Sequence, residues 1–254
     1  MKELHSKRIE DFRREVAALR PFAVSPHAHI VKLLAAFRYD ASFYLLFPWA
    51  QGDLRCFWRE NCRPMSDTAL KRWITGQFVG LASALDRIHQ QSNVSMSARS
   101  KTVYPRLYNH RSRHGDIKPE NILWFKERTD EAHPIGGTLK ITDFGLARSH
   151  PIADQDEFER PRGYSRTYRA PEFDIKGAIG GAYDLWSFGC VVLETAVWLI
   201  RGWEGVTSFA LSRAGRTGRG DDAFFERSTS RTQCASLVNL KPEVVQVGPI
   251  CAHV

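Results

Sequence analysis

Long apolar runs and paired cysteines are both missing from this sequence. No apolar run reaches the roughly 20 residues that a membrane-spanning helix needs. The residues after Met1 do not form the apolar stretch of a secretory signal peptide. The 5 cysteines are scattered without a CxxC pair, which argues against a disulfide framework or a zinc site. We therefore expect an intracellular protein, cytoplasmic or nuclear, that does not contact a membrane.

The composition otherwise suits a folded protein with a basic surface. With 254 residues, of which 43% are hydrophobic, the chain can build one large domain or two small ones around a real core. Its formal net charge is +8, and such an excess attracts phosphate-bearing or acidic partners. Binding of nucleic acid would need basic residues interleaved with aromatic ones on one face, and the sequence shows only loose basic clusters. We expect no nucleic-acid partner.

The first 60 residues predict a helix followed by strands. Apolar residues recur at helical spacing over 3–20, and Pro21 is expected to end that helix. Two short apolar runs, at 30–34 and 42–47, flank a polar break and predict a strand hairpin. A short helix is expected over 54–59.

The rest of the chain is predicted to be mainly helical. A long amphipathic helix is expected to end near His89. Short apolar runs at 122–125 and 139–141 are separated by turn-forming residues. Residues 183–200 are apolar nearly all round, which is typical of a helix buried in the centre of a domain. Residues 226–254 show no reliable period.

Three short motifs carry polar residues in an order that indicates chemistry. They are HGDIKPEN at 114–121, DFG at 143–145 and YRAPE at 168–172. A fourth motif, DLWSFG, follows at 184–189. DFG alone would be a weak signal, but the four motifs in this order and spacing are highly specific.

Through these motifs the chain resembles the eukaryotic protein kinases, in which the same elements follow in the same order. The resemblance extends over about residues 3–225. It implies an α+β, protein-kinase-like fold with a mainly helical C-terminal lobe and an incomplete N-terminal lobe. The expected parts are a partial N-lobe at 1–50, the C-lobe at 51–226 and an atypical, disordered tail at 227–254.

The motifs contain the groups that phosphoryl transfer needs, which are mainly groups for positioning and for neutralising charge. Asp116 can orient the substrate hydroxyl and accept its proton, and Lys118 can offset charge on the moving phosphoryl group. Asn121 and Asp143 offer the hard oxygen ligands that magnesium prefers. We expect ATP and Mg²⁺ as cofactors, with Lys118 also in contact with the nucleotide. By the resemblance, Lys118 favours Ser/Thr over Tyr acceptors in the protein substrate.

The resemblance also implies residues that surround the nucleotide. Glu15 is the best match for the acidic residue of the family's third helix. Phe47 matches the gatekeeper, and backbone groups of Trp49 and Ala50 would hold the adenine. Taken alone, Phe47 and Trp49 would be interpreted as ordinary core or surface aromatics.

Other residues that match the family are expected to pack beside this site and to hold the catalytic loop in place. His114 and Phe144 would be packing residues, stacked with Leu19 and Leu33 in a column that links the two lobes. His114 is therefore not expected to act as a base. Ser165 stands where the family has a Ser or Thr that steadies the catalytic loop.

The sequence departs from the family near its start. The family's glycine-rich phosphate loop and the strand lysine that partners Glu15 are expected before Glu15, yet the first glycine is Gly52 and neither feature is identified. Loss of one preorganised charge contact costs about 3–4 kcal/mol in the barrier. We therefore expect this chain alone to be a poor catalyst, well below the rates of about 1–100 per second usual for kinases.

A second departure concerns regulation. Gly115 replaces the arginine that in the family pairs with an activation-loop phosphate. Activity is therefore not expected to depend strongly on phosphorylation of Ser149, Ser165 or Thr167. Residues 90–113 lengthen the approach to the catalytic loop, either as an interaction insert or, as we favour, as a tolerated loop, and residues 92–101 within them are expected to be disordered.

Two readings of function from different classes stay open at this point. The first is a protein Ser/Thr kinase, favoured by the complete set of Asp116, Lys118, Asn121 and Asp143. The second is a pseudokinase-like module that binds a partner and transfers no phosphate, favoured by the unidentified glycine loop and lysine. A small-molecule kinase is disfavoured because the APE element at 170–172 argues for a protein substrate.

Overall fold

The computed structural model describes residues 1–4, 6–61, 68–90, 110–126, 136–151, 164–176, 180–215, 220–228 and 237–251. The helices, of which the two η elements are 3₁₀ turns, are α1 Ile9–Val24, α2 Leu54–Glu60, α3 Thr68–His89, η1 Pro119–Asn121, η2 Phe144–Leu146, α4 Pro171–Lys176, α5 Gly181–Arg213 and α6 Pro242–Cys251. The strands are β1 Lys2–Glu3, β2 Ala35–Tyr39, β3 Ser42–Leu46, β4 Gly52–Asp53, β5 His110–Arg113, β6 Ile122–Phe125, β7 Thr138–Ile141, β8 Arg148–Pro151, β9 Phe225–Ser228 and β10 Leu237–Leu240.

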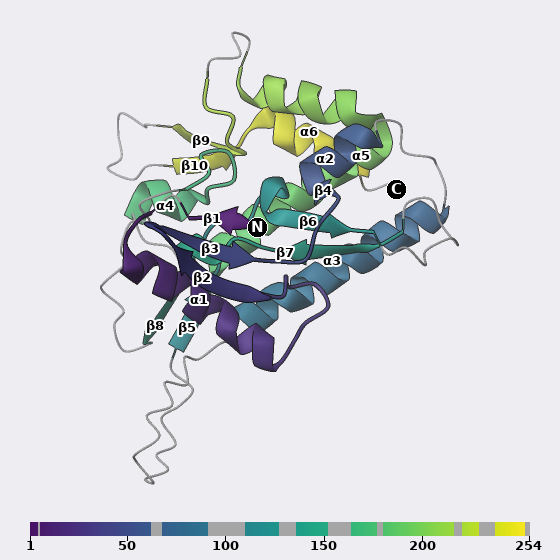
Figure 1. Ribbon diagram of the computed structural model, residues 1–254. Helices are drawn as coiled ribbons and strands as arrows, with labels where there is room; N and C mark the ends of the chain where they lie inside the picture. Colours follow the sequence, from purple (N-terminus) through teal and green to yellow (C-terminus); the bar gives the residue numbers. More distant parts are fainter. Residues whose placement is uncertain are drawn as a thin grey trace.

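Small antiparallel sheets separate the helices, which confirms the predicted α+β class. The orders are β1-β3-β2 and β4-β6-β7, with two further pairs, β5-β8 and β9-β10. In Figure 1, α1 lies together with β2 and β3, while α6 packs beside α5 on another side of the molecule. The strands β6 and β7 lie between these two groups in the same view (Figure 1).

The first helix begins later and ends later than the sequence predicts. Lys2 and Glu3 form β1, which pairs with β3, and α1 starts only at Ile9. Pro21 lies inside α1 and does not end it. Proline removes one backbone hydrogen bond from a helix. The last turn is nevertheless kept, because Phe22 is 3% exposed and its ring packs against Phe144 at 5.6 Å between centroids.

The first strand of the hairpin lies at a different place from the predicted one. The prediction of a strand over 30–34 is wrong, because β2 covers 35–39 and pairs with β3. Ile30 and Val31 are buried for another reason: they run beside β7. Val31 N donates to Ile141 O, and Ile141 N donates to His29 O, each at 2.9 Å. The buried apolar run thus forms its backbone hydrogen bonds with the edge strand of another sheet.

The core of the helical part is built around an aromatic cluster. The ring of Phe57 on α2 contacts three tryptophans, Trp73 at 5.5 Å, Trp124 at 5.0 Å and Trp198 at 5.4 Å between centroids. These come from α3, β6 and α5, so the cluster ties together the elements predicted at 54–59, 122–125 and 183–200. The expected helix ending near His89 and the expected central helix are both confirmed.

Helix α5 is longer than its apolar pattern predicts. It continues to Arg213 across a kink at Gly202, whose φ of 68° lies in the left-handed region that favours glycine. By length and composition this helix could cross a membrane, yet half of its most apolar window is buried inside the protein. Its contacts with α2, α3 and α6 make it a core helix of this fold.

The segment after residue 226 contains regular structure, against the expectation of a disordered tail. Strand β10 pairs with β9 along its whole length, and Lys241 N donates to Phe224 O at 3.1 Å. Helix α6 packs on α5 with Val244 and Val247 buried. These two valines are separated by one helical turn, a signal too short to stand out in the sequence. The strand pair therefore continues across the boundary expected at 226.

Candidate active site

Asp116 is the centre of a small network of hydrogen bonds. Its carboxylate accepts from Asn121 Nδ2 at 2.9 Å and from Ser165 Oγ at 2.9 Å. Lys118 Nζ lies 2.8 Å from the same carboxylate. Asn121 Nδ2 also donates to the backbone oxygen of Asp116 at 2.8 Å. Three residues of the HGDIKPEN motif are thus brought together with Ser165, and the expected contact of Ser165 with the catalytic loop is present.

The catalytic loop itself is held by Asp184, whose part sequence analysis missed. This side chain is fully buried in α5 and accepts from the backbone amides of His114 at 2.7 Å and Gly115 at 2.8 Å. His89 Nε2 at the end of α3 lies 2.8 Å from Asp184 Oδ2. A buried carboxylate needs such partners. The signal in the sequence was the first residue of the DLWSFG motif, to which no role was assigned.

Gly115 occupies a backbone position that suits glycine. Its φ of +84° lies in the left-handed region, and an added Cβ would meet the backbone oxygen of Leu146 at 3.2 Å. The turn aims both adjacent amides at Asp184 and places Asp116 beyond it. The glycine that departs from the family motif therefore fits the local geometry of this loop.

Asp143 comes directly after Thr142, whose backbone is hydrogen-bonded to the catalytic loop. Thr142 N donates to Asn121 O at 2.9 Å, so the two expected metal ligands come from adjoining segments. Asp143 has a left-handed φ of 64°, and its Oδ1 accepts from Gly145 N at 3.3 Å. Asp116, Asn121 and Asp143 therefore lie on adjoining segments, as a single site would require.

Lys2 completes this site and corrects the sequence analysis. Its Nζ lies 2.8 Å from Glu15 Oε1 and 2.8 Å from Asp143 Oδ1 (salt bridges to both). The conclusion that no strand lysine partners Glu15 is wrong, because Lys2 on β1 does so. Two residues are too few to show strand periodicity, and the pairing of β1 with β3 that positions Lys2 is visible only in three dimensions.

The three charges in this cluster shift one another's pKa values. Burial alone would lower the pKa of Lys2, but the charges of Glu15 and Asp143 outweigh it and raise that pKa. Burial raises the pKa of Glu15, and Lys2 offsets this only in part. Burial would also raise the pKa of Asp143, yet Lys2 and the amide of Gly145 lower it. Asp143 is therefore ionised at neutral pH.

Stacked rings connect this cluster to the catalytic loop. The rings of His114 and Phe144 meet edge to face at 5.0 Å, and Phe22 continues the stack on the α1 side. Leu19 is buried as expected, whereas Leu33 is half-buried. The Nε2 atom of His114 lies 2.9 Å from Thr142 O, which fits the expected packing role.

The segment expected to hold the adenine follows β3. Phe47 is half-buried and packs against the core, whereas the side chain of Trp49 is 86% exposed. Leu34 N donates to Leu46 O at 2.8 Å before the segment, and Gln51 N donates to Trp124 O at 3.0 Å after it. The backbone from 47 to 50, Ala50 included, is thus fixed at both ends between two sheets.

The oxygen atoms at this site suit magnesium that also binds nucleotide phosphates. They are too few for a metal ion held by protein side chains alone. Among the residues that the structure describes, no group of three or more His, Cys, Asp or Glu comes together to hold a metal. The amide nitrogen of Asn121 faces Asp116, which leaves its carbonyl oxygen for a metal, and Asp143 adds an ionised carboxylate. Magnesium commonly takes one or two protein oxygens and completes its shell with water and phosphate.

Comparison with known proteins agrees with this geometry. Residues 101–199 match the protein kinase domain family, a range that holds all four motifs. The chain is 30% identical over 186 residues to cyclin-dependent kinase 4 of Ovis aries, an alignment that covers 71% of this chain and 50% of that relative. It is 28% identical over 183 residues to cyclin-dependent kinase F-4 of Oryza sativa subsp. japonica, which covers 71% of this chain and 31% of that relative.

The chain thus spans between about a third and a half of the length of these curated relatives. The matched range contains the loop around Asp116, the DFG turn at Asp143 and the start of α5 with Asp184. Residues 101–199 thus match a protein kinase domain, and the chain is similar to eukaryotic protein kinases of the cyclin-dependent kind.

Proposed function

We propose that this protein transfers the terminal phosphate of ATP to a serine or threonine hydroxyl of another protein. The observation that carries the proposal is the set of contacts on Asp116, because Lys118, Asn121 and Ser165 all lie within 2.9 Å of its carboxylate. Side chains fixed in this way are preorganised for proton transfer and charge stabilisation.

The residues divide the work of the reaction among them. Asp116 orients the acceptor hydroxyl and takes its proton while the new oxygen–phosphorus bond forms and the bond to the ADP oxygen breaks. Lys118, 2.8 Å from Asp116, offsets the charge on the moving group. Lys2 contacts the phosphates of the nucleotide, and its ion pair with Glu15 fixes the position of its ammonium group. Asn121 and Asp143 would hold magnesium, which would supply positive charge that neutralises the phosphates.

The expected independence from loop phosphorylation stays a prediction, and two contacts argue against activation by a phosphate at Ser165 or Thr167. The hydroxyl of Ser165 donates to Asp116, and that of Thr167 donates to both carboxylate oxygens of Asp222 at 2.9 and 2.8 Å. A phosphate on either hydroxyl would face a carboxylate, and like charges repel. Ser149 has no described side chain, so its part of the prediction lies outside the described residues.

The proposal is tested by following labelled phosphate from ATP into peptides that carry Ser, Thr or Tyr as the sole acceptor. Wild type is expected to label Ser or Thr peptides, and Asp116→Asn is expected to lower that rate about 10²–10⁴-fold, as is usual for loss of a catalytic base. Asparagine keeps the shape of the side chain. Labelling that survives Asp116→Asn, or that is confined to Tyr, would contradict the proposal. Partner binding without any labelling would favour the pseudokinase-like alternative.

A further inference from the structure

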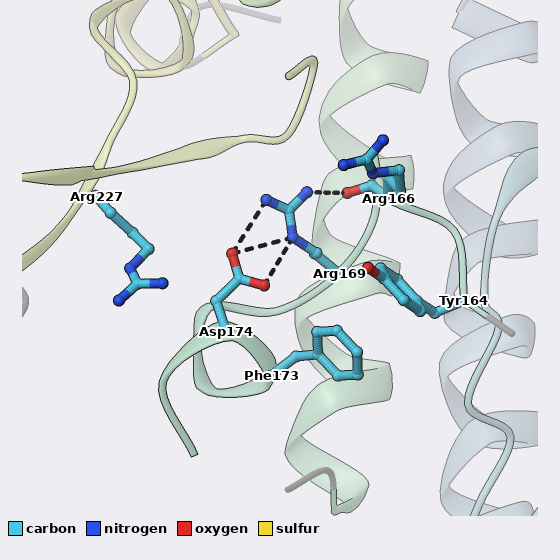
Figure 2. A pocket seen from close by; sticks show the side chains of 6 residues that line it. All are labelled: Tyr164, Arg166, Arg169, Phe173, Asp174 and Arg227. Atoms are coloured by element: carbon cyan, nitrogen blue, oxygen red, sulfur yellow. Dashed lines mark hydrogen bonds and ion pairs between the residues drawn. The ribbon is translucent and has the colours of Figure 1, made fainter. Parts of the chain in front are cut away.

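The ion-paired cluster beside α4 keeps its charges near neutral pH. Figure 2 shows Arg169 bonded to Asp174 and to the backbone oxygen of Arg166, and Asp221 also pairs with Arg169. Burial opposes these charges, but the pairing outweighs it, so the pKa of Asp221 is lowered and that of Arg169 is raised. A response to pH between 5 and 8 needs imidazole groups instead, and a pair of them lies elsewhere in the fold.

The segment between α1 and β2 carries two histidines, His27 and His29, which face α3 and β7. His29 N donates to His27 Nδ1 at 3.1 Å, and His27 Nε2 lies 3.3 Å from Ser83 Oγ on α3. His29 Nδ1 lies 2.8 Å from the backbone oxygen of Leu139 on β7. The two rings are 6.1 Å apart between centroids. We call His27 and His29 the histidine clasp, because they fasten this segment to both elements.

The hydrogen bonds fix the proton positions of both rings. His27 Nδ1 accepts from a backbone amide, so this atom carries a lone pair and the proton of the neutral ring is on Nε2. A carbonyl oxygen only accepts, so His29 carries its proton on Nδ1. The other nitrogen of His29 faces Gly80, where an added Cβ would lie 2.0 Å from Nε2. Glycine at this position therefore gives the ring room against α3.

Acid breaks this arrangement at both rings. A proton on His27 Nδ1 turns the acceptor into a second donor that faces the amide of His29, so that hydrogen bond is lost. A proton on His29 Nε2 points at the backbone of Gly80, and among the described residues Nε2 has no hydrogen-bond partner. A buried charge without a partner is costly. Protonation therefore favours a state in which the segment has left α3.

The charged groups around the clasp add to this effect, because they are cations. Arg87 on α3 acts on His27, and Lys140 on β7 acts on His29. Among the described residues, no carboxylate pairs with either ring. Burial, His29 and Arg87 lower the pKa of His27, and burial lowers the pKa of His29 despite its hydrogen bond to a backbone oxygen. The closed state thus binds these protons less readily than an open state, and acid favours the open one.

The clasp bears on the active site because it stands at the end of α1. The last turn of this helix packs Phe22 on Phe144, with 5.6 Å between ring centroids. Glu15, two turns earlier, lies 2.8 Å from Lys2. A helix that loses its anchor at one end moves more freely there, so release of the clasp loosens the helix that positions the ion pair of Glu15 with Lys2.

We propose that the histidine clasp is an acid-sensitive switch, in which the neutral rings fasten the end of α1 to α3 and β7 and protonation of both rings releases it. This inference goes beyond the proposed function, because it concerns how α1 is attached. It is therefore tested without phosphate transfer, and it stands or falls separately from the kinase activity.

Hydrogen exchange at pH 5.0 and pH 7.5, corrected for the intrinsic effect of pH on exchange, measures the release. In wild type, peptides that cover residues 19–31 are expected to be about 2–10-fold less protected at pH 5.0, which is the scale of one net hydrogen bond. Peptides around Trp198, which is fully buried in α5, are the internal control and are expected to keep their protection. Equal protection of residues 19–31 at both pH values would overturn the inference.

The decisive variant replaces both histidines by asparagine. His27→Asn keeps an acceptor for the amide two residues on, as in an Asx turn, and His29→Asn keeps a donor for the oxygen of Leu139. Neither asparagine titrates, so the double variant is expected to protect residues 19–31 equally at both pH values. A loss of protection in acid as large as that of wild type would assign the effect to other groups and overturn the inference.

A titration of the rings themselves covers the case in which the double variant does not fold. Histidine labelled with ¹³C at Cε1 gives one NMR signal for each ring, and the single variants His27→Asn and His29→Asn identify the two signals. Both rings are expected to titrate below the ordinary value of about 6.5. A midpoint at or above that value for either ring would contradict the switch, because the closed state would then hold its protons as readily as the open one.

Discussion

Replacement of Lys2 by methionine is expected to lower kcat about 10²–10³-fold, the usual effect of removing one preorganised charge contact at a transition state. Lys2 lies 2.8 Å from both Glu15 and Asp143, so the variant removes a positive charge beside an expected magnesium ligand. Steady-state phosphate transfer to a Ser peptide measures the change. Lys2→Arg keeps the charge and is expected to retain more activity than Lys2→Met.

The same variant has a pH-dependent effect on stability. Burial already raises the pKa of Glu15, and loss of Lys2 raises it further. A raised folded-state pKa favours the folded protein at low pH and opposes it once Glu15 must ionise. Lys2→Met is therefore expected to be more destabilised at pH 8 than at pH 5, and Lys2→Met combined with Glu15→Gln is expected to show less of this difference, because only Asp143 then still contributes to it. An equal loss of stability at both pH values would show that the pair is not formed.

Replacement of Arg213 by methionine is expected to lower the free energy of unfolding by about 3–5 kcal/mol, the range for breaking a buried ion pair. Arg213 is 2% exposed, and its Nη2 lies 2.8 Å from Glu194 Oε1. Tyr168 O–H donates to Glu194 Oε2 at 2.7 Å, and the guanidinium packs on the rings of Phe209 and Phe224. Urea unfolding followed by tryptophan fluorescence measures the loss.

Two control variants separate the charge from the packing. Arg213→Met leaves Glu194 buried without its cation, so the double variant Arg213→Met, Glu194→Gln is expected to be more stable than Arg213→Met alone. Arg201→Met removes an exposed arginine from the same helix and is expected to change stability by less than about 0.5 kcal/mol. If Arg213→Met behaves like Arg201→Met, the buried pair does not stabilise the fold.

The candidate site was predictable where the chemistry sits in short motifs. Asp116, Lys118, Asn121 and Ser165 are close in the structure because a turn and one neighbouring segment bring them together. Lys2 was missed because its role depends on the pairing of β1 with β3. A strand of two residues is too short to be predicted from the sequence pattern. Asp184 was missed for a related reason, since the amides it accepts belong to residues about 70 positions away in the chain.

The fold was predictable where periodicity is long and strong, as in α3 and α5. Errors arose where tertiary contacts override local signals. Pro21 stays inside α1 because Phe22 packs on Phe144. Ile30 has the apolar character of a strand but bonds to the edge of β7 as an isolated bridge. The tail folds because β10 and α6 find partners in β9 and α5, which only the assembled chain provides.

The central claim is that Asp116, Asn121 and Asp143 form one magnesium–nucleotide site. Thermal unfolding with ATP, measured with and without Mg²⁺ for wild type and Asp143→Asn, tests it most directly. At a hundredfold excess of ATP over its dissociation constant, binding stabilises by about 2.7 kcal/mol, which for a chain of this size raises Tm by about 5–10 °C. We expect that rise in wild type only with Mg²⁺, and no such rise in Asp143→Asn. The same rise in both proteins, or in neither, would contradict the claim.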